Sequence, residues 1–171
     1  MQHGGVLLGM LAAAFAGRGG RFGSLRAWQI GGCLMSALML LGLVAAGVVG
    51  QAWPFRATVF ALGAANGAFS IAAIATMMRL ASEGRHAREG TRMGLWGAAQ
   101  AVAFGMGGLV GTAASDLANA LIGSPAQAYA AVFAFEALLF VAAAVLAARL
   151  GAPVGALRAA SVQLTGAAPA L

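Results

Sequence analysis

The sequence predicts an all-α integral membrane protein, built as a bundle of several membrane-spanning helices. Of its 171 residues, 61% are hydrophobic and only 8% are charged, whereas soluble domains are about 25% charged. Four apolar runs are each long enough to cross roughly 30 Å of hydrocarbon. Backbone polar groups in lipid need partners within their own segment, so we expect helices rather than the short alternating strands of a barrel.

The elements follow in order along the chain. The first apolar run, residues 4–17, is short, and no basic residue precedes it as in a signal peptide. We interpret it as a partial span, the tail of a longer helix. Full spans are predicted at residues 28–50, 57–78, 94–115 and 129–148, and only the last contains a charge, Glu136. The predicted domains are a membrane bundle over residues 1–150 and a flexible tail over residues 151–171.

The basic residues predict the orientation of the spans. All ten are Arg, and nine of them lie on one side if the spans alternate, with Arg56 alone on the other side. Because basic loops stay in the cytoplasm, we expect residues 18–26, residues 79–93 and the C-terminal tail to be cytoplasmic.

Several classes of function are disfavoured by composition. The Arg residues lie between apolar runs, as topology signals do, so we expect no nucleic-acid partner. The sequence has one Cys and two His. A structural zinc site uses about four such ligands, so we expect no metal site. The sequence shows no paired carboxylates, no Ser/His/Asp set and no phosphate-binding loop after a strand. We therefore expect no catalytic residues and no enzyme activity.

Two motifs carry a family resemblance. The inner loop that contains Gly17, Arg18, Arg21 and Gly23 resembles the Gly/Arg-rich inner-loop motif of the major facilitator superfamily, although the acidic residue of that motif is absent. The stretch from Arg88 to Gly108, with residues 21–28 and 66–69, resembles the PucC/LhaA group, the bacteriochlorophyll-delivery branch of that superfamily.

The resemblance runs from about residue 17 to residue 150 and implies the C-terminal part of a major facilitator fold. A full member has twelve spans, of which this chain would match the last five, so we expect a truncated fragment whose N-terminal half is missing. It also implies a phototrophic bacterium, an inner or intracytoplasmic photosynthetic membrane, and a role in the assembly of light-harvesting complexes. Bacteriochlorophyll as a bound cofactor, antenna polypeptides and membrane lipid are then the expected partners.

Four residues are candidates for binding pigment or substrate. Asn66 is polar within a span, where it either bonds a neighbouring helix or lines a ligand path. Gln100 either bonds another helix or ligates a chlorophyll magnesium through its side-chain oxygen, beside Phe104 one turn further on. Glu136 lies deep in the last span, where a carboxyl group must be protonated, paired or facing a cavity.

Two further groups of residues have a structural and a functional interpretation. A stripe of small residues predicts close helix packing, or a flat surface for a tetrapyrrole; its glycines are Gly94, Gly97, Gly105 and Gly108. The cytoplasmic loop residues Arg88, Glu89 and Arg92 are expected to form ion pairs on a short interfacial helix. The functional alternative is a docking surface for anionic lipid or antenna polypeptides.

Three functions remain open. The first is a pigment-handling assembly factor, which the resemblance implies. The second is half of a proton-coupled secondary transporter of a small solute, with Glu136 as the titrating group. The third is a fragment without an independent activity.

Overall fold

The chain folds into helices throughout the part that the computed structural model describes, which is residues 1–18, 24–82 and 89–150. These segments contain five α-helices and one short 3-10 turn and no strand. They are α1 (Gln2–Arg18), α2 (Leu25–Val49), η1 (Gly50–Ala52), α3 (Phe55–Ser82), α4 (Glu89–Ile122) and α5 (Pro125–Leu150). Four of the helices, α2 to α5, are long and apolar enough to cross a membrane. The predicted multi-span helical bundle is confirmed.

The helices extend beyond the apolar runs that predicted them, and α4 does so most. It has 34 residues, or about 51 Å at 1.5 Å per residue, which is longer than the roughly 30 Å of a bilayer core. Residues 116–122, which lie beyond the predicted span over residues 94–115, continue this helix. No glycine or proline interrupts the chain there until Gly123, whose φ of +67° ends the helix. The predicted tail, residues 151–171, lies outside the described residues.

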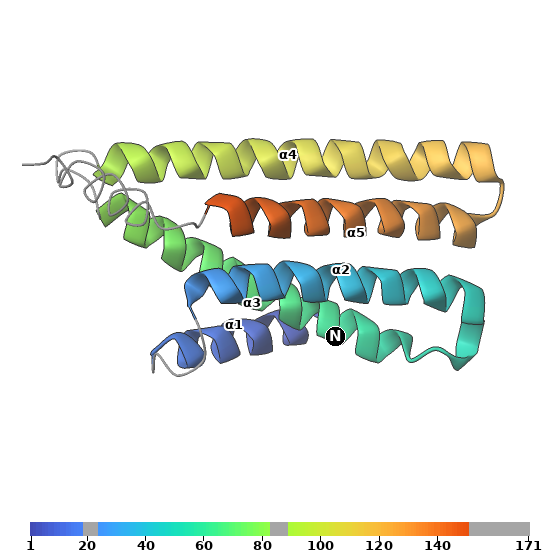
Figure 1. Ribbon diagram of the computed structural model, residues 1–171. Coiled ribbons are helices and arrows are strands. Elements are labelled where there is room, and N and C mark those ends of the chain that lie inside the picture. The colour runs from blue at the N-terminus through green and yellow to red at the C-terminus, as the bar shows by residue number, and fades with distance from the viewer. Residues whose placement is uncertain (19–23, 83–88, 151–171) are drawn as a thin grey trace, which may run out of the picture.

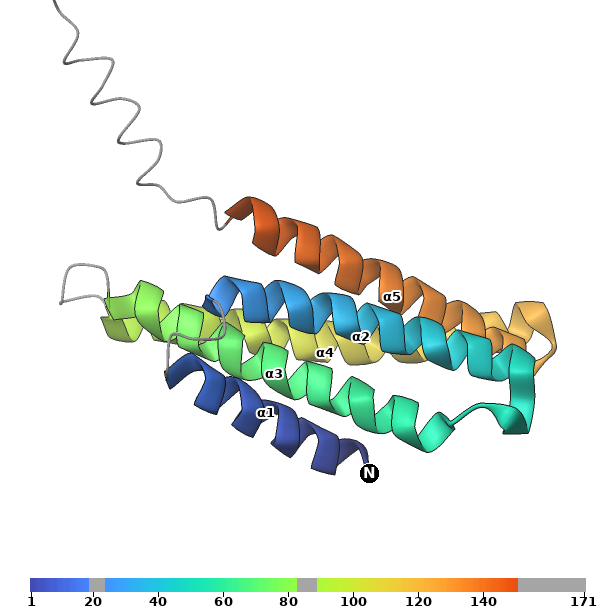
Figure 2. The ribbon, with the colours of Figure 1, turned by 60° about the horizontal axis from the view of Figure 1, so that its bottom comes forward.

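The helices are arranged around α2 and α3 (Figure 1). Helix α2 packs against both α3 and α5, and α1 packs against α3. Ala37, Leu40 and Leu43 of α2 meet Leu62 of α3 and Ala137 of α5 in the buried core. Seen from another direction, α1 lies along α3 on the outside of the bundle (Figure 2).

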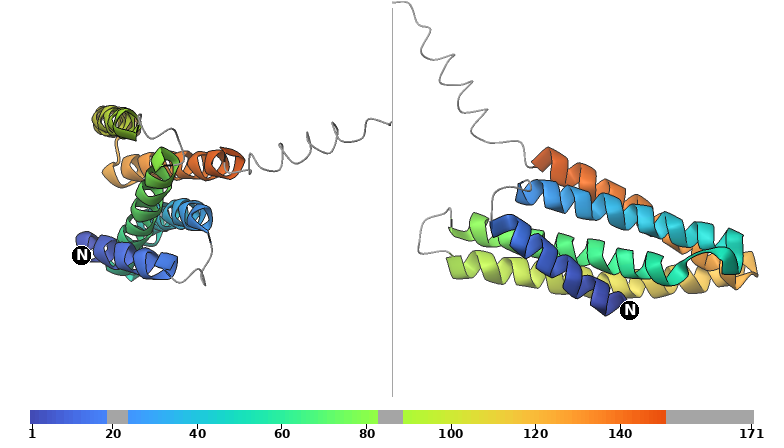
Figure 3. Two further views of the ribbon diagram at one scale, coloured as in Figure 1. Left: turned by 90° about the vertical axis from the view of Figure 1, so that its left-hand side faces the viewer. Right: turned by 90° about the horizontal axis from the view of Figure 1, so that it is seen from below.

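Helix α4 is the peripheral member of the bundle. Viewed along the helices, it stands apart from α1, α2 and α3 (Figure 3). It contacts α5 and, near its own beginning, α3. None of its residues is buried. Such a helix satisfies its backbone polar groups by its own hydrogen bonds. Its apolar side chains can face lipid or another protein equally well, because lipid is as apolar as they are.

Glycines bring α1 and α3 into very close contact. A Cβ at Gly9 would overlap the carbonyl oxygen of Ala64, and a Cβ at Gly67 would overlap that of Val6. Gly5 and Gly63 make equivalent approaches to Phe60 and Gln2. Each helix thus contributes two glycines four residues apart, the spacing at which small residues let membrane helices touch through their backbones.

Local contacts set the beginnings of two helices. Ser24 caps α2, because its hydroxyl accepts a hydrogen bond from the Ala27 amide over 3.2 Å. At the start of α3, the indole of Trp53 donates to the Thr58 hydroxyl over 3.0 Å. Thr58 is itself buried and donates to the Pro54 carbonyl. These bonds hold the connection between α2 and α3 against the bundle.

Candidate functional site

Asn66 joins two helices through a hydrogen bond. The hydroxyl of Ser36, a buried residue on α2, donates a hydrogen bond to the side-chain oxygen of Asn66 over 2.8 Å. Asn66 lies in the middle of α3, and its backbone carbonyl accepts a second bond from the Ser70 hydroxyl. Of the two roles predicted for this residue, the structure shows the bond to a neighbouring helix. The role in binding a ligand stays a prediction.

The α4–α5 hairpin carries the other three candidates, Gln100 and Phe104 on α4 and Glu136 on α5. They lie at different distances from the turn that joins the two helices. Gln100 is half-buried and Phe104, one turn further along α4, is 73% exposed. Glu136 is half-buried on α5. At 1.5 Å per residue, Gln100 lies about 33 Å from the turn that joins the helices, and Glu136 only about 17 Å from it. Gln100 and Glu136 are therefore roughly 16 Å apart along the hairpin, at two separate places on it.

The glycine stripe of α4 contacts no other helix in the described chain. A Cβ at Gly94, Gly97, Gly105 or Gly108 would meet nothing within 4 Å. The close glycine contact occurs instead between α1 and α3, at Gly9 and Gly67 among others. The difference arises because α4 lies at the edge of the bundle. The packing of another helix against these α4 glycines stays a prediction, because no described helix contacts them.

The inner-loop motif is described only in part. Gly17 and Arg18 are the last two residues of α1. Arg21 and Gly23 of the same motif, and Arg88 of the second cytoplasmic loop, lie outside the described residues. Glu89 begins α4 and Arg92 lies in its first turn, so both belong to the long helix rather than to a separate short one. Glu89 is favourably placed there, because a negative charge stabilises a helix N-terminus.

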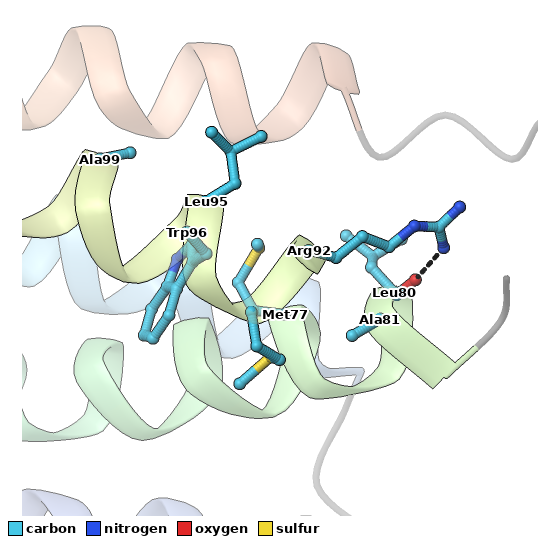
Figure 4. Close-up of a pocket in the computed structure, with 8 residues that line it drawn as sticks. Met77, Leu80, Ala81, Arg92, Leu95, Trp96 and Ala99 are labelled. Carbon is cyan, nitrogen blue, oxygen red and sulfur yellow. Dashed lines mark hydrogen bonds between the residues drawn. The ribbon is translucent and has the colours of Figure 1, made fainter. Parts of the chain in front are cut away.

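Arg92 connects the start of α4 to the end of α3 and borders a cavity. Its Nη1 donates to the carbonyl oxygen of Leu80 over 3.2 Å. The cavity has a volume of about 440 Å³. Trp96 points from α4 toward α3 at this place, beside Met77 (Figure 4). A second groove of about 330 Å³ lies between α2 and α3, where Trp28, Gly32 and Ala65 are among its lining.

One contact at the same end of the bundle was not predicted. The guanidinium of Arg26, in the first turn of α2, donates to the carbonyl oxygen of Ala148 near the end of α5. The last carbonyls of a helix have no partner within it, so an Arg from a neighbouring helix satisfies one of them. The basic residue was visible in the sequence as a topology signal, but its partner depends on α2 and α5 lying side by side.

Comparison with known proteins identifies the family. No solved structure matches the chain. A protein of Rhodobacter capsulatus, named bacteriochlorophyll synthase 44.5 kDa chain, is 51% identical over 158 residues. That match covers 92% of this chain and 36% of the relative, so the chain spans about a third of the relative's length. The family model described as PUCC protein matches residues 1–154. The chain therefore belongs to the PUCC protein family.

Proposed function

We propose that this chain forms part of a membrane factor that handles bacteriochlorophyll during the assembly of light-harvesting complexes. The observation that carries the proposal is its membership of the PUCC family together with its 51% identity to a protein named for bacteriochlorophyll synthesis. The four apolar spans support a site of action within the membrane. Because the chain spans only part of that relative, the activity is proposed for the whole polypeptide.

Binding rather than catalysis is the proposed role. The name of the relative contains the word synthase, but the polar side chains within the spans do not converge here. Asn66 bonds Ser36 at the contact between α3 and α2, whereas Gln100 and Glu136 lie apart along the α4–α5 hairpin. General acid–base chemistry requires two groups within hydrogen-bond reach of one substrate. Dispersed polar groups on apolar helices fit the recognition of a large hydrophobic ligand better.

The face of α4 that carries Gln100 and Phe104 is the proposed pigment surface. The side-chain oxygen of Gln100 is a suitable axial ligand for magnesium, which prefers oxygen donors. The ring of Phe104, one turn away and exposed, offers an aromatic surface for stacking against a macrocycle. Glycine on the same helix leaves room for a flat ligand to approach the backbone, since a Cβ at Gly97 or Gly105 would meet nothing within 4 Å.

The test replaces the magnesium ligand in the natural polypeptide expressed in a phototroph. Gln100→Leu should lower the amount of bacteriochlorophyll that co-purifies with the protein and leave the protein level unchanged. Gln127→Leu is the matched control, because Gln127 is an exposed glutamine in the first turn of α5. Equal pigment content in Gln100→Leu, Gln127→Leu and the unaltered protein would remove Gln100 from the proposed site.

Location and orientation are part of the same proposal. We place the protein in the inner or intracytoplasmic membrane of a phototrophic bacterium, with the C-terminus in the cytoplasm. We further propose that the bundle is the C-terminal part of a major facilitator fold, as in the LhaA-like members. The alternating helices support this arrangement, because they bring Arg26, Arg79, Arg92 and Arg149 to one end of the bundle. Antenna polypeptides are the proposed protein partners.

A proton-coupled transporter is the second candidate, because a carboxyl group, Glu136, lies half-buried in the middle of α5. Glu136→Gln preserves size and hydrogen bonding but cannot ionise. An assembly factor should keep its activity with this change, and a proton-coupled carrier should lose it. Antenna complexes measured by absorption in a strain that carries Glu136→Gln separate the two. A complete loss of antenna assembly would favour the titrating carboxyl group and the transporter.

A further inference from the structure

The cavity between the end of α3 and the start of α4 lies at the Arg-rich end of the bundle. Met77, Leu80 and Ala81 of α3 line one side of it, and Arg92, Trp96 and Ala99 are among the residues that line the other. Figure 4 shows the indole of Trp96 pointing into the space between the two helices. The lining is therefore apolar along its length and basic at its outer end.

Among the described residues that line this cavity, Arg92 carries the charge. Its bond to the Leu80 carbonyl, 3.2 Å long, holds the side chain across the end of α3. A guanidinium group carries five N–H donors, so this bond leaves others available for an anion. Arg26, Arg79 and Arg149 lie at the same end of the bundle, on α2, α3 and α5.

We propose that this cavity binds one anionic phospholipid. Its phosphate group contacts the guanidinium of Arg92, and an acyl chain lies against Met77 and Trp96 between the two helices. The planar guanidinium matches phosphate oxygens in a two-bond geometry that an ammonium group cannot provide. Basic pockets between membrane helices on the cytoplasmic side are typical sites for anionic lipid head groups. Trp96 suits this position, because its ring is apolar and its N–H is polar.

The chemistry of the lining favours a phospholipid over the pigment and over a polar solute. A bacteriochlorophyll magnesium requires an axial oxygen or nitrogen ligand, and the side chains of the described lining residues are those of Met, Leu, Ala, Trp and Arg. A small polar solute requires several hydrogen-bonding groups around it, whereas the polar side chains among the described lining residues are Arg92 and the Trp96 indole. The lipid proposal does not depend on the proposed pigment surface on α4, so either proposal can fail while the other holds.

The experiment compares lipid retention by native mass spectrometry, using the 171-residue chain in mild detergent with added phosphatidylglycerol or phosphatidylcholine. The unaltered chain should retain phosphatidylglycerol preferentially. Arg92→Gln should reduce that preference about fivefold, since one Arg near a membrane surface contributes about 1 kcal/mol to the attraction of anionic lipid. Arg56→Gln is the matched control, because Arg56 is exposed at the opposite end of the bundle.

A second variant tests the apolar part of the cavity. Ala99→Phe places a ring in the space assigned to the acyl chain, and it should lower phosphatidylglycerol retention while the helical circular dichroism signal stays unchanged. Three results would overturn the proposal: equal retention of both lipids by the unaltered chain, an equal effect of Arg92→Gln and Arg56→Gln, or full retention by Ala99→Phe. Retention of bacteriochlorophyll that depends on Arg92 would assign the cavity to the pigment instead.

Discussion

Replacing Gly67 by Ala should destabilise the bundle, although the same change is favourable in an ordinary helix. The added Cβ would overlap the backbone carbonyl of Val6 on α1. A carbonyl belongs to the backbone of α1 and cannot rotate away as a flexible side chain does. The two helices must therefore separate by more than about 1 Å to reach an ordinary van der Waals contact, and a gap of even about 0.5–1 Å forfeits a quarter to a half of each lost dispersion contact.

The size of the effect follows from two opposing contributions. Overpacking of a close contact costs about 1–3 kcal/mol, and Ala is favoured over Gly within a helix by about 1 kcal/mol. We expect Gly67→Ala to lower the free energy of unfolding by up to about 2 kcal/mol. For a chain of this length, 1 kcal/mol corresponds to about 2–4 °C in the melting temperature.

Gly108→Ala is the matched control, because a Cβ at Gly108 meets nothing within 4 Å. This variant should gain about 1 kcal/mol from the higher helix propensity of Ala and melt about 2–4 °C above the unaltered chain. Thermal unfolding of all three proteins in one detergent, followed by far-UV circular dichroism, measures the difference. If Gly67→Ala melts no lower than Gly108→Ala, the backbone contact between α1 and α3 does not contribute as argued.

Two further predictions concern polar contacts and orientation. Ser36→Ala removes the donor to Asn66 and should lower the free energy of unfolding by about 0.6 kcal/mol and at most about 1.7 kcal/mol, the average and the maximum measured for hydrogen bonds between membrane helices. The Ser115 hydroxyl donates to the carbonyl of Gly111 on its own helix, so Ser115→Ala should lower the free energy of unfolding less in the same thermal assay. Reporter proteins fused after Ser24 and Gly90 should be cytoplasmic and one fused after Ser124 periplasmic, because nine of the ten Arg are predicted to lie on one side. A periplasmic signal at Gly90 would contradict that orientation.

Helices α2 and α3 were predictable because the length and hydropathy of an apolar run identify a segment that can cross a membrane. Residues 28–50 and 57–78 were placed within a few residues of α2 and α3. The ends of α4 were not, since charged residues such as Asp116 are compatible with a helix that continues past the hydrocarbon into the interface. The helix ends before Gly123, whose φ of +67° is left-handed.

The candidate site was less predictable, because it depends on which helices are neighbours. Asn66 was identified as a polar residue in a span, and either predicted role fitted the sequence. The choice between them required its partner, Ser36, which lies 30 residues away. Likewise the cavity beside Arg92 exists because α3 and α4 approach at one end, and no motif in the sequence encodes that approach.

The glycines show most clearly what an apolar sequence leaves open. Both α1 and α4 carry glycines at intervals of three or four residues, yet only those of α1 meet another backbone. Hydrophobicity does not distinguish the two cases, because lipid solvates an apolar helix as well as protein does. Glycine in a helix nevertheless costs about 1 kcal/mol relative to alanine. The glycines of α4 carry that cost without a contact in the described chain. Gly108→Leu should therefore be tolerated in the 171-residue chain, and a loss of stability caused by this change would show that a further helix packs on α4.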